Sequence, residues 1–235
     1  MRNLNTIPDG ANLPEHLCPP EIATDVFALC WEEIIQGEDD FAYRIPEEFD
    51  DLDDDQADAI AEYVIELRRT QQEGFGNVQT NLALAFSELE DHGILTSQIC
   101  EHTVDEGYAA LLEEAEEDPE RWHGVAYIPG VSVQNYASEL VYRMMPESED
   151  AHEAPVALEL TPDLATFSLA YAAILTPEEF ELTDEESTEI FNTRTTELMN
   201  SHVIPALEKH GITVQWSGSP ADLAEISNVE FYEPI

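Results

Sequence analysis

Acidic side chains run through almost every segment of this chain, and apolar residues are set between them. Stretches such as "EEFDDLDDDQAD", "EEAEEDPE" and "PEEFELTDEESTE" place Phe, Leu or Ala among the carboxylates. Ionised carboxylates are almost never buried without a partner, and 52 Asp and Glu face only 8 Lys and Arg. The acids should therefore lie on the solvated faces of folded elements. The hydrophobic content of 43% supplies a core, which a disordered acidic tail would lack.

The formal net charge of −44 limits the possible partners. It repels nucleic-acid phosphates and anionic membrane surfaces, so we expect no direct binding to nucleic acid or to membranes. It could attract a basic partner protein. No apolar run approaches the roughly 20 residues of a membrane span, and the first 20 residues lack the apolar core of a secretory signal. Cys18, Cys30 and Cys100 form no C-x-x-C pair, which indicates reduced thiols and a cytoplasmic location.

The stretch "EEFDDLDDDQADAIAE" (47–62) allows two interpretations. Asp51, Asp53, Asp55 and Glu62 occupy the first, third, fifth and twelfth places of a calcium-loop template. Gln56, however, stands where that template needs Gly for its sharp turn. Alternatively, Asp53 caps a helix while Gln56 reaches back to it in a capping box, and the other acids favour the helix dipole. The helix explains more of the pattern and is our prediction.

Hydrophobic periodicity, turn residues and capping boxes divide the remainder into elements. The first predicted helix covers 20–37, and another is capped by Asn77 and ended by Gly93. A third predicted helix opens with the Thr103–Glu106 box and buries Ala109, Leu112 and Ala115. The last runs from the Thr183–Glu186 box to His210, with a break near Ser201 caused by Pro205. The segment 131–137 resembles a single helical turn. The predicted strands are 94–99, 124–129, 139–145, 155–160, 167–174, 212–216 and 223–231.

Several of these strands are consecutive, so the order of elements does not follow a strict β-α-β alternation. This order favours an α+β fold with a mainly antiparallel sheet covered by helices. We expect an N-terminal helical segment over 1–75, followed by an α+β domain over 76–235.

Two segments, "LALAFSELEDHGIL" followed by "GVAYIP", and "IPALEKHGITVQWSGSP", together resemble an uncharacterised bacterial family that is defined only as a domain of unknown function. The resemblance spans about residues 76–235 and is weak around 137–166. That family commonly carries several cysteines after its first strand, whereas this chain keeps only Cys100. The resemblance therefore implies a fold neighbourhood and no reaction. The matching residues are Leu89, Gly93 and Ile94 in the first turn, Gly124 with 125–128 in the Gly-led strand, and Gly211, Val214, Trp216 and Gly218 in the last strand.

The residues that carry chemistry do not form a recognisable catalytic or metal motif. Cys100, His102, Glu106 and His123 are the best metal candidates, but no Cys or His pair has zinc spacing, and we expect no metal and no cofactor. The chain has no G-x-S-x-G motif and no phosphate-binding loop of the Walker type. Trp122 at a helix–strand junction is the first candidate for a recognition surface. The predicted binding residues are Cys100, His102, Arg121, Trp122 and His123.

Three functions remain open. The first is a non-catalytic binding or regulatory protein with a basic partner, because no set of catalytic residues converges. The second is a decoy that imitates nucleic acid and occupies a basic DNA-binding protein, which the net charge favours. The third is an enzyme of unknown class with Cys100 as its nucleophile.

Overall fold

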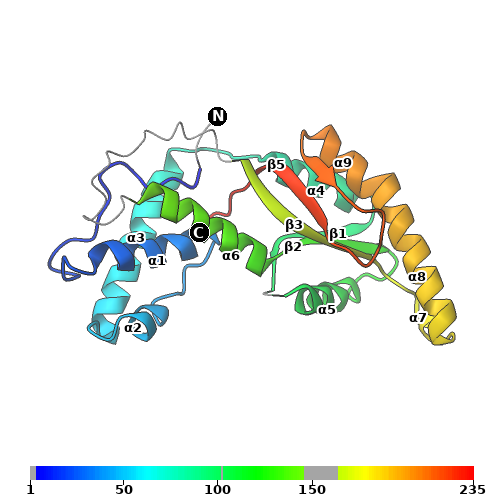
Figure 1. Ribbon diagram of the computed structural model, residues 1–235, viewed down its shortest axis with the longest axis horizontal. Coiled ribbons are helices and arrows are strands. Elements are labelled where there is room, and N and C mark those ends of the chain that lie inside the picture. Colours follow the sequence, from blue (N-terminus) through cyan, green and yellow to red (C-terminus); the bar gives the residue numbers. More distant parts are fainter. Residues whose placement is uncertain (1–3, 102, 146–163) are drawn as a thin grey trace. The chain divides into compact units, whose positions relative to one another are not determined.

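The structure is a computed structural model that describes residues 4–101, 103–145 and 164–235 (Figure 1). These residues form two compact units. Unit 1 contains residues 4–78, 134–145 and 232–235, and unit 2 contains 79–133 and 164–231. The division into domains predicted after residue 75 stays a prediction, although the first boundary between the units, after Val78, lies close to it.

Unit 2 is built on a five-stranded sheet with the order β1-β2-β3-β5-β4. β1 and β2 are parallel and are joined through helix α5, whereas β2–β3, β3–β5 and β4–β5 are antiparallel. The predicted α+β fold with a mainly antiparallel sheet is therefore confirmed. The strands are β1 (Ile94–Cys100), β2 (Gly124–Pro129), β3 (Leu164–Ala173), β4 (Thr213–Gln215) and β5 (Ala224–Glu230).

Helices cover both faces of this sheet (Figure 1). Tyr127 of β2 packs against Gly107 of α5, and Gly124 of β2 packs against Leu198 of α8. Side chains three residues apart on a strand point to opposite faces, so α5 and α8 lie on opposite sides of β2. The helices are α4 (Asn81–Asp91), α5 (Val104–Ala115), α7 (Pro177–Phe180), α8 (Asp184–Leu198), the π-helical turn η1 (Met199–Val203) and α9 (Ile204–Lys209).

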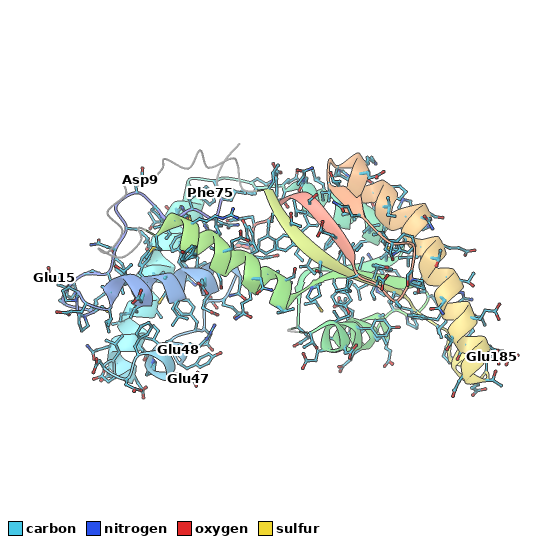
Figure 2. All side chains as sticks on the ribbon, viewed as in Figure 1. Asp9, Glu15, Glu47, Glu48, Phe75 and Glu185 are labelled. Atoms are coloured by element: carbon cyan, nitrogen blue, oxygen red, sulfur yellow. The ribbon has the colours of Figure 1, made fainter. Side chains whose placement is uncertain are left out.

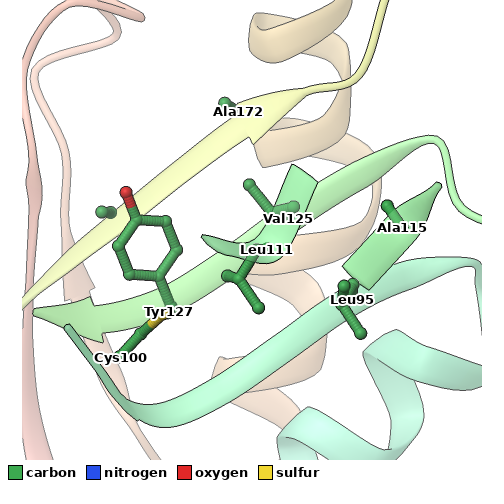
Figure 3. Close-up of a cluster of buried hydrophobic side chains, with 8 residues drawn as sticks. Leu95, Cys100, Leu111, Ala115, Val125, Tyr127 and Ala172 are labelled. Carbon is green, nitrogen blue, oxygen red and sulfur yellow. The ribbon is translucent and has the colours of Figure 1, made fainter. Parts of the chain in front are cut away.

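One part of the apolar core of unit 2 lies between α5 and the sheet (Figure 3). The side chains of Leu111 and Ala115 on α5 meet those of Leu95, Val125 and Tyr127 on the strands. Gly107 has no side chain, so the Tyr127 ring approaches the helix closely; a Cβ atom at residue 107 would lie 2.6 Å from the ring. The close approach fixes which face of α5 is buried.

Unit 1 is helical. Its helices are α1 (Ala23–Ile35), α2 (Arg44–Glu48), α3 (Asp54–Glu73) and the part of α6 (Gly130–Met144) that follows residue 133. Val26, Cys30 and Ile34 of α1 and Ile60 and Val64 of α3 are fully buried, as their helical spacing predicts. Residues 4, 5 and 232 also pack against this core, through Arg68.

Arg68 is fully buried, although the sequence places it at the polar end of a helix. Its guanidinium donates to the Leu4 carbonyl at 2.6 Å and to Asn5 Oδ1 at 3.2 Å. It also lies within 6 Å of the ring centroids of three aromatic residues, where cation–π attraction adds to the hydrogen bonds. These rings belong to Trp31, Phe75 and Tyr232.

Local capping predictions are confirmed where the motif is complete. Asp53 accepts from the Gln56 backbone at 2.9 Å, and the Gln56 side chain accepts from the Asp53 backbone, so α3 begins as predicted. The boxes at Thr103 and Thr183 are formed as well. The predicted break near Ser201 is the π-helical turn η1, which precedes Pro205.

Three predictions about elements are wrong. Residues 139–145 are not a strand, because 130–144 form α6, with Ala137, Leu140 and Val141 buried at helical spacing. Thr80, and not Asn77, caps α4, since Thr80 Oγ1 accepts from the Ala83 backbone. The buried face of α5 carries Gly107, Leu111 and Ala115, and Ala109 is exposed, because Tyr127 needs the space at residue 107. The predicted strand 155–160 lies outside the described residues.

Candidate functional site

The structure does not bring Cys100 and His123 together. Cys100 ends β1 and pairs with Pro129 at the end of the parallel strand β2, whereas His123 precedes the first residue of β2. A six-residue strand spans roughly 20 Å, so the two side chains lie at opposite ends of β2. His102 lies outside the described residues.

Cys100 has the environment of a structural thiol. Its side chain is 8% exposed, and its Sγ donates to the Gly107 carbonyl at 3.5 Å. Burial, with a smaller effect from the nearby Glu101 carboxylate, raises the pKa of this thiol. The thiolate is the reactive form, so the structure gives no support to Cys100 as a nucleophile.

The other predicted recognition residues lie together before β2. Trp122 is half-buried and packs against the core below α5, and the Arg121 guanidinium covers its ring at 4.0 Å from the centroid. His123 is exposed, and its backbone N–H donates to the Gly93 carbonyl. The face of Trp122 is thus occupied by its own neighbour, and the exposed members of this group are Arg121 and His123.

Among residues 4–101, 103–145 and 164–235, no group of three or more His, Cys, Asp or Glu side chains could hold a metal ion. The calcium-loop positions Asp55 and Glu62 both lie in the continuous helix α3. A straight helix cannot wrap around an ion as a calcium loop does. In the same described segments, no helix is long and apolar enough to cross a membrane.

The best candidate site is an acidic groove in unit 1 with a volume of about 760 Å³. One wall is a face of α3, where charged residues recur three or four positions apart and therefore line up on one side of the helix. The opposite wall is the loop that follows α1. The lining residues are Leu17, Asp39, Asp40, Ala42, Asp58, Ala59, Ala61, Glu62, Tyr63, Ile65, Glu66 and Arg69.

Two contacts hold the walls of this acidic groove in place. Arg69 of α3 forms an ion pair with Asp39 of the loop, with 3.3 Å between Nη2 and Oδ2. The Tyr63 hydroxyl donates to the Asn12 carbonyl at 3.1 Å and so attaches the N-terminal segment beside α3. With one arginine against five carboxylates, the lining carries a formal charge of −4.

Sequence reasoning did not find this groove. It identified the acids of α3 as a solvated face, and the exposed Glu47, Glu48 and Glu185 illustrate that ordinary role (Figure 2). The charge periodicity of Asp58, Glu62 and Glu66 was visible in the sequence. What the sequence does not show is that Asp39 and Asp40 lie opposite them.

No family model, curated protein or solved structure matches this chain. The resemblance to an uncharacterised bacterial family therefore stays a prediction.

Proposed function

We propose that this protein is a non-catalytic binding protein that holds a basic segment of a partner protein in the acidic groove of unit 1. The observation that carries the proposal is the groove itself, in which five carboxylates on two walls face one arginine. Carboxylates on opposing walls attract a cationic segment from both sides, which favours fast association and fixes its position.

The dimensions of the groove suit a short peptide. From Asp58 to Arg69 the α3 wall runs for about 17 Å, at 1.5 Å per residue. An extended segment of about five residues has this length. A volume of about 760 Å³ also lies within the range of about 300–1,000 Å³ that is typical of ligand sites.

The groove also offers apolar contacts. Leu17, Tyr63 and Ile65 are half-buried and lie among the carboxylates. Lysine and arginine side chains pack their aliphatic stems on such surfaces while their charged heads reach acidic groups. We therefore expect a partner segment in which Lys or Arg alternates with apolar residues, and arginine-rich segments should bind best because guanidinium groups pair with carboxylates in two hydrogen bonds.

A reducing compartment fits the three free, buried cysteines, and we propose a cytoplasmic location. Cell fractionation would test this part of the proposal, and recovery of the protein with secreted or membrane fractions would contradict it.

The binding experiment compares two triple variants with equal charge changes. The groove variant carries Asp58→Asn, Glu62→Gln and Glu66→Gln, and the control carries Glu113→Gln, Glu116→Gln and Glu117→Gln on and just after α5 in unit 2. A fluorescent peptide of alternating Arg and Leu serves as the probe, and fluorescence anisotropy measures its Kd. Each exposed ionic contact contributes about 0.2–1 kcal/mol, so loss of three should make the groove variant bind roughly 3- to 150-fold more weakly than the control.

Equal losses of affinity in both triple variants would show that binding follows total charge and not the groove, and would contradict the proposal. A variant that retains wild-type affinity after loss of all three groove acids would do so as well. Circular dichroism of each variant checks that the helices remain folded.

A further inference from the structure

A second pocket, entirely within unit 2, gathers imidazoles and an arginine in a chain dominated by acids. Its volume is about 430 Å³, enough for a small molecule. The pocket lies beside the start of β2, along the end of α8 and the turn η1 that continues it. Its lining residues are His123, Ala173, Arg194, Glu197, Leu198, Ser201 and His202.

The histidines come from separate elements. His123 precedes β2, and its ring packs so closely on Gly93 that a Cβ there would lie 2.7 Å from Nδ1. His202 lies in η1, with its ring centroid 6.3 Å from that of His123. His92, at the end of α4, lies 5.2 Å from His202 on the same measure. Three imidazoles from distant parts of the chain thus meet at one place.

The turn that carries His202 has an identifiable cause. Pro205 has no backbone N–H, so it cannot donate to the Ser201 carbonyl in the regular helical pattern. The chain forms the π-helical turn Met199–Val203 before it continues as α9. Such turns frequently occur at functional sites because they change the direction in which side chains leave a helix.

The charged groups of the lining make this pocket electrostatically unlike the rest of the surface. Arg194 is held by Glu179, whose two carboxylate oxygens accept from its guanidinium, one of them at 2.6 Å. Glu197 is the one carboxylate in the lining. With neutral histidines the lining has a formal charge of zero, or −1 when Glu179, the partner of Arg194, is included. With His123 and His202 protonated these totals become +2 and +1, whereas the whole chain carries −44.

We propose that the histidine pocket binds a small oxyanion, a carboxylate or a phosphate-like group, through Arg194 and the imidazoles of His123 and His202. Leu198 and Ala173 supply apolar contact beneath the ligand, and Ser201 supplies a hydroxyl. Hydrogen bonds from ionised donors to an oxyanion are short and strong, and Arg194 would contribute the guanidinium N–H groups that Glu179 does not occupy. The proposal is independent of the acidic groove in unit 1.

Binding should be coupled to proton uptake. In the free protein, partial burial and the neighbouring His202 and His92 lower the pKa of His123. An oxyanion between these rings would favour their charged forms, so the affinity should rise as the pH falls. The other charged groups of the lining are Arg194, which is paired with Glu179, and Glu197, whose carboxylate opposes the ligand.

Titrations with sodium sulfate and sodium oxalate at constant ionic strength test the proposal on the full chain. Both probes stay dianionic between pH 7.5 and 5.5, so any pH dependence comes from the protein, and tetrahedral and planar oxyanions are distinguished. Imidazole NMR signals report the binding. We expect saturable shifts of the His123 and His202 signals. For each proton taken up, the affinity should be about tenfold higher at pH 5.5 than at pH 7.5.

His202→Gln should weaken the binding roughly tenfold, as expected for the loss of a charged hydrogen bond. His16→Gln, at an exposed position in unit 1, is the matched control and should leave the affinity unchanged. His123→Gln provides a second test if the first variant does not fold. The proposal is overturned if neither anion saturates at pH 5.5, if the control loses affinity equally, or if Zn²⁺ binds saturably while both oxyanions do not.

Discussion

Leu198 of α8 lies directly over the backbone of Gly124, the first residue of β2. A Cβ atom at residue 124 would be 2.0 Å from Leu198 Cδ1 and 3.2 Å from the Ala172 carbonyl oxygen. The glycine therefore allows α8 to pack on the sheet at the point where Leu198 also lines the histidine pocket.

Gly124→Ala should lower the free energy of unfolding by about 1–3 kcal/mol, the usual effect of overpacking a core. Urea denaturation measures the change. Leu198→Ala removes the clashing methyl groups, so the double variant should lose less stability than the sum of the losses in the two single variants. Additive losses would show that the two residues do not compete for the same space.

Arg68→Met should lower the stability by about 3 kcal/mol, because the buried Asn5 and the partly buried acceptors of Leu4 and Gln71 lose their donor. Burial lowers the pKa of Arg68 only to about 10, so it carries a charge at neutral pH. Arg69→Met is the control, since its exposed ion pair with Asp39 contributes at most about 1 kcal/mol. Thermal unfolding of both variants measures the two losses of stability, and equal losses would contradict a special role for Arg68.

The stability of the folded chain should decrease as the pH falls below 6.5. The pKa of His123 is lowered from 6.5 in the folded state, so the unfolded chain takes up a proton first and is favoured in acid. The contribution is fully present above pH 6.5 and disappears as the pH falls through the folded-state pKa. His123→Gln should reduce this loss, and urea denaturation at pH 7.5, 6.5 and 5.5 measures it. An unchanged pH profile in the variant would assign the loss to other groups.

Added NaCl should raise the melting temperature. Five carboxylates form ion pairs within the described part of the chain, on Glu33, Asp39, Glu88, Glu139 and Glu179, whereas the sequence holds 52 acids. Most of the negative charge is therefore uncompensated, and salt screens its self-repulsion. A melting temperature that stays constant or falls from 20 mM to 1 M NaCl would show local compensation that the ion pairs do not reveal.

Thiol reagents should react slowly with all three cysteines until the chain is unfolded. Cys18, Cys30 and Cys100 are 1%, 0% and 8% exposed, and burial raises the pKa of each thiol, to about 12 for Cys30. Labelling with a chromogenic disulfide at neutral pH, with and without urea, measures the rates. Rapid reaction of Cys100 in the native protein would revive the hypothesis of a catalytic thiol.

The sequence predicts local structure well because local structure depends on neighbouring residues. The capping boxes at Asp53, Thr103 and Thr183 each involve residues three positions apart, and all three begin helices. The Pro205 effect is equally local. Segment 139–145 shows the limit, because its Val and Tyr favour a strand locally, whereas packing of its apolar residues at helical spacing makes it part of α6.

Both candidate sites depend on contacts between distant segments. The acidic groove combines Leu17, Asp39 and α3, and the histidine pocket combines His123 with Arg194 and His202. Periodicity shows which face of a helix is polar but not which other segment lies opposite it. His123 was predicted as a binding residue from its position beside a strand. Its proximity to His92 and His202 was not predicted. Arg68 was placed at a helix end, and only its contacts with residues 4, 5 and 232 reveal its burial.

The described backbone of unit 1 comes from three stretches of chain, and residues of unit 2 lie between them in the sequence. During synthesis, Tyr232 reaches the ribosome exit only after every residue of unit 2. The aromatic surroundings of Arg68 therefore stay incomplete until the strands of unit 2, including β5, have been synthesised. The N-terminal helices of unit 1 should accordingly reach their full stability only after unit 2 has been synthesised and Tyr232 has packed against Arg68.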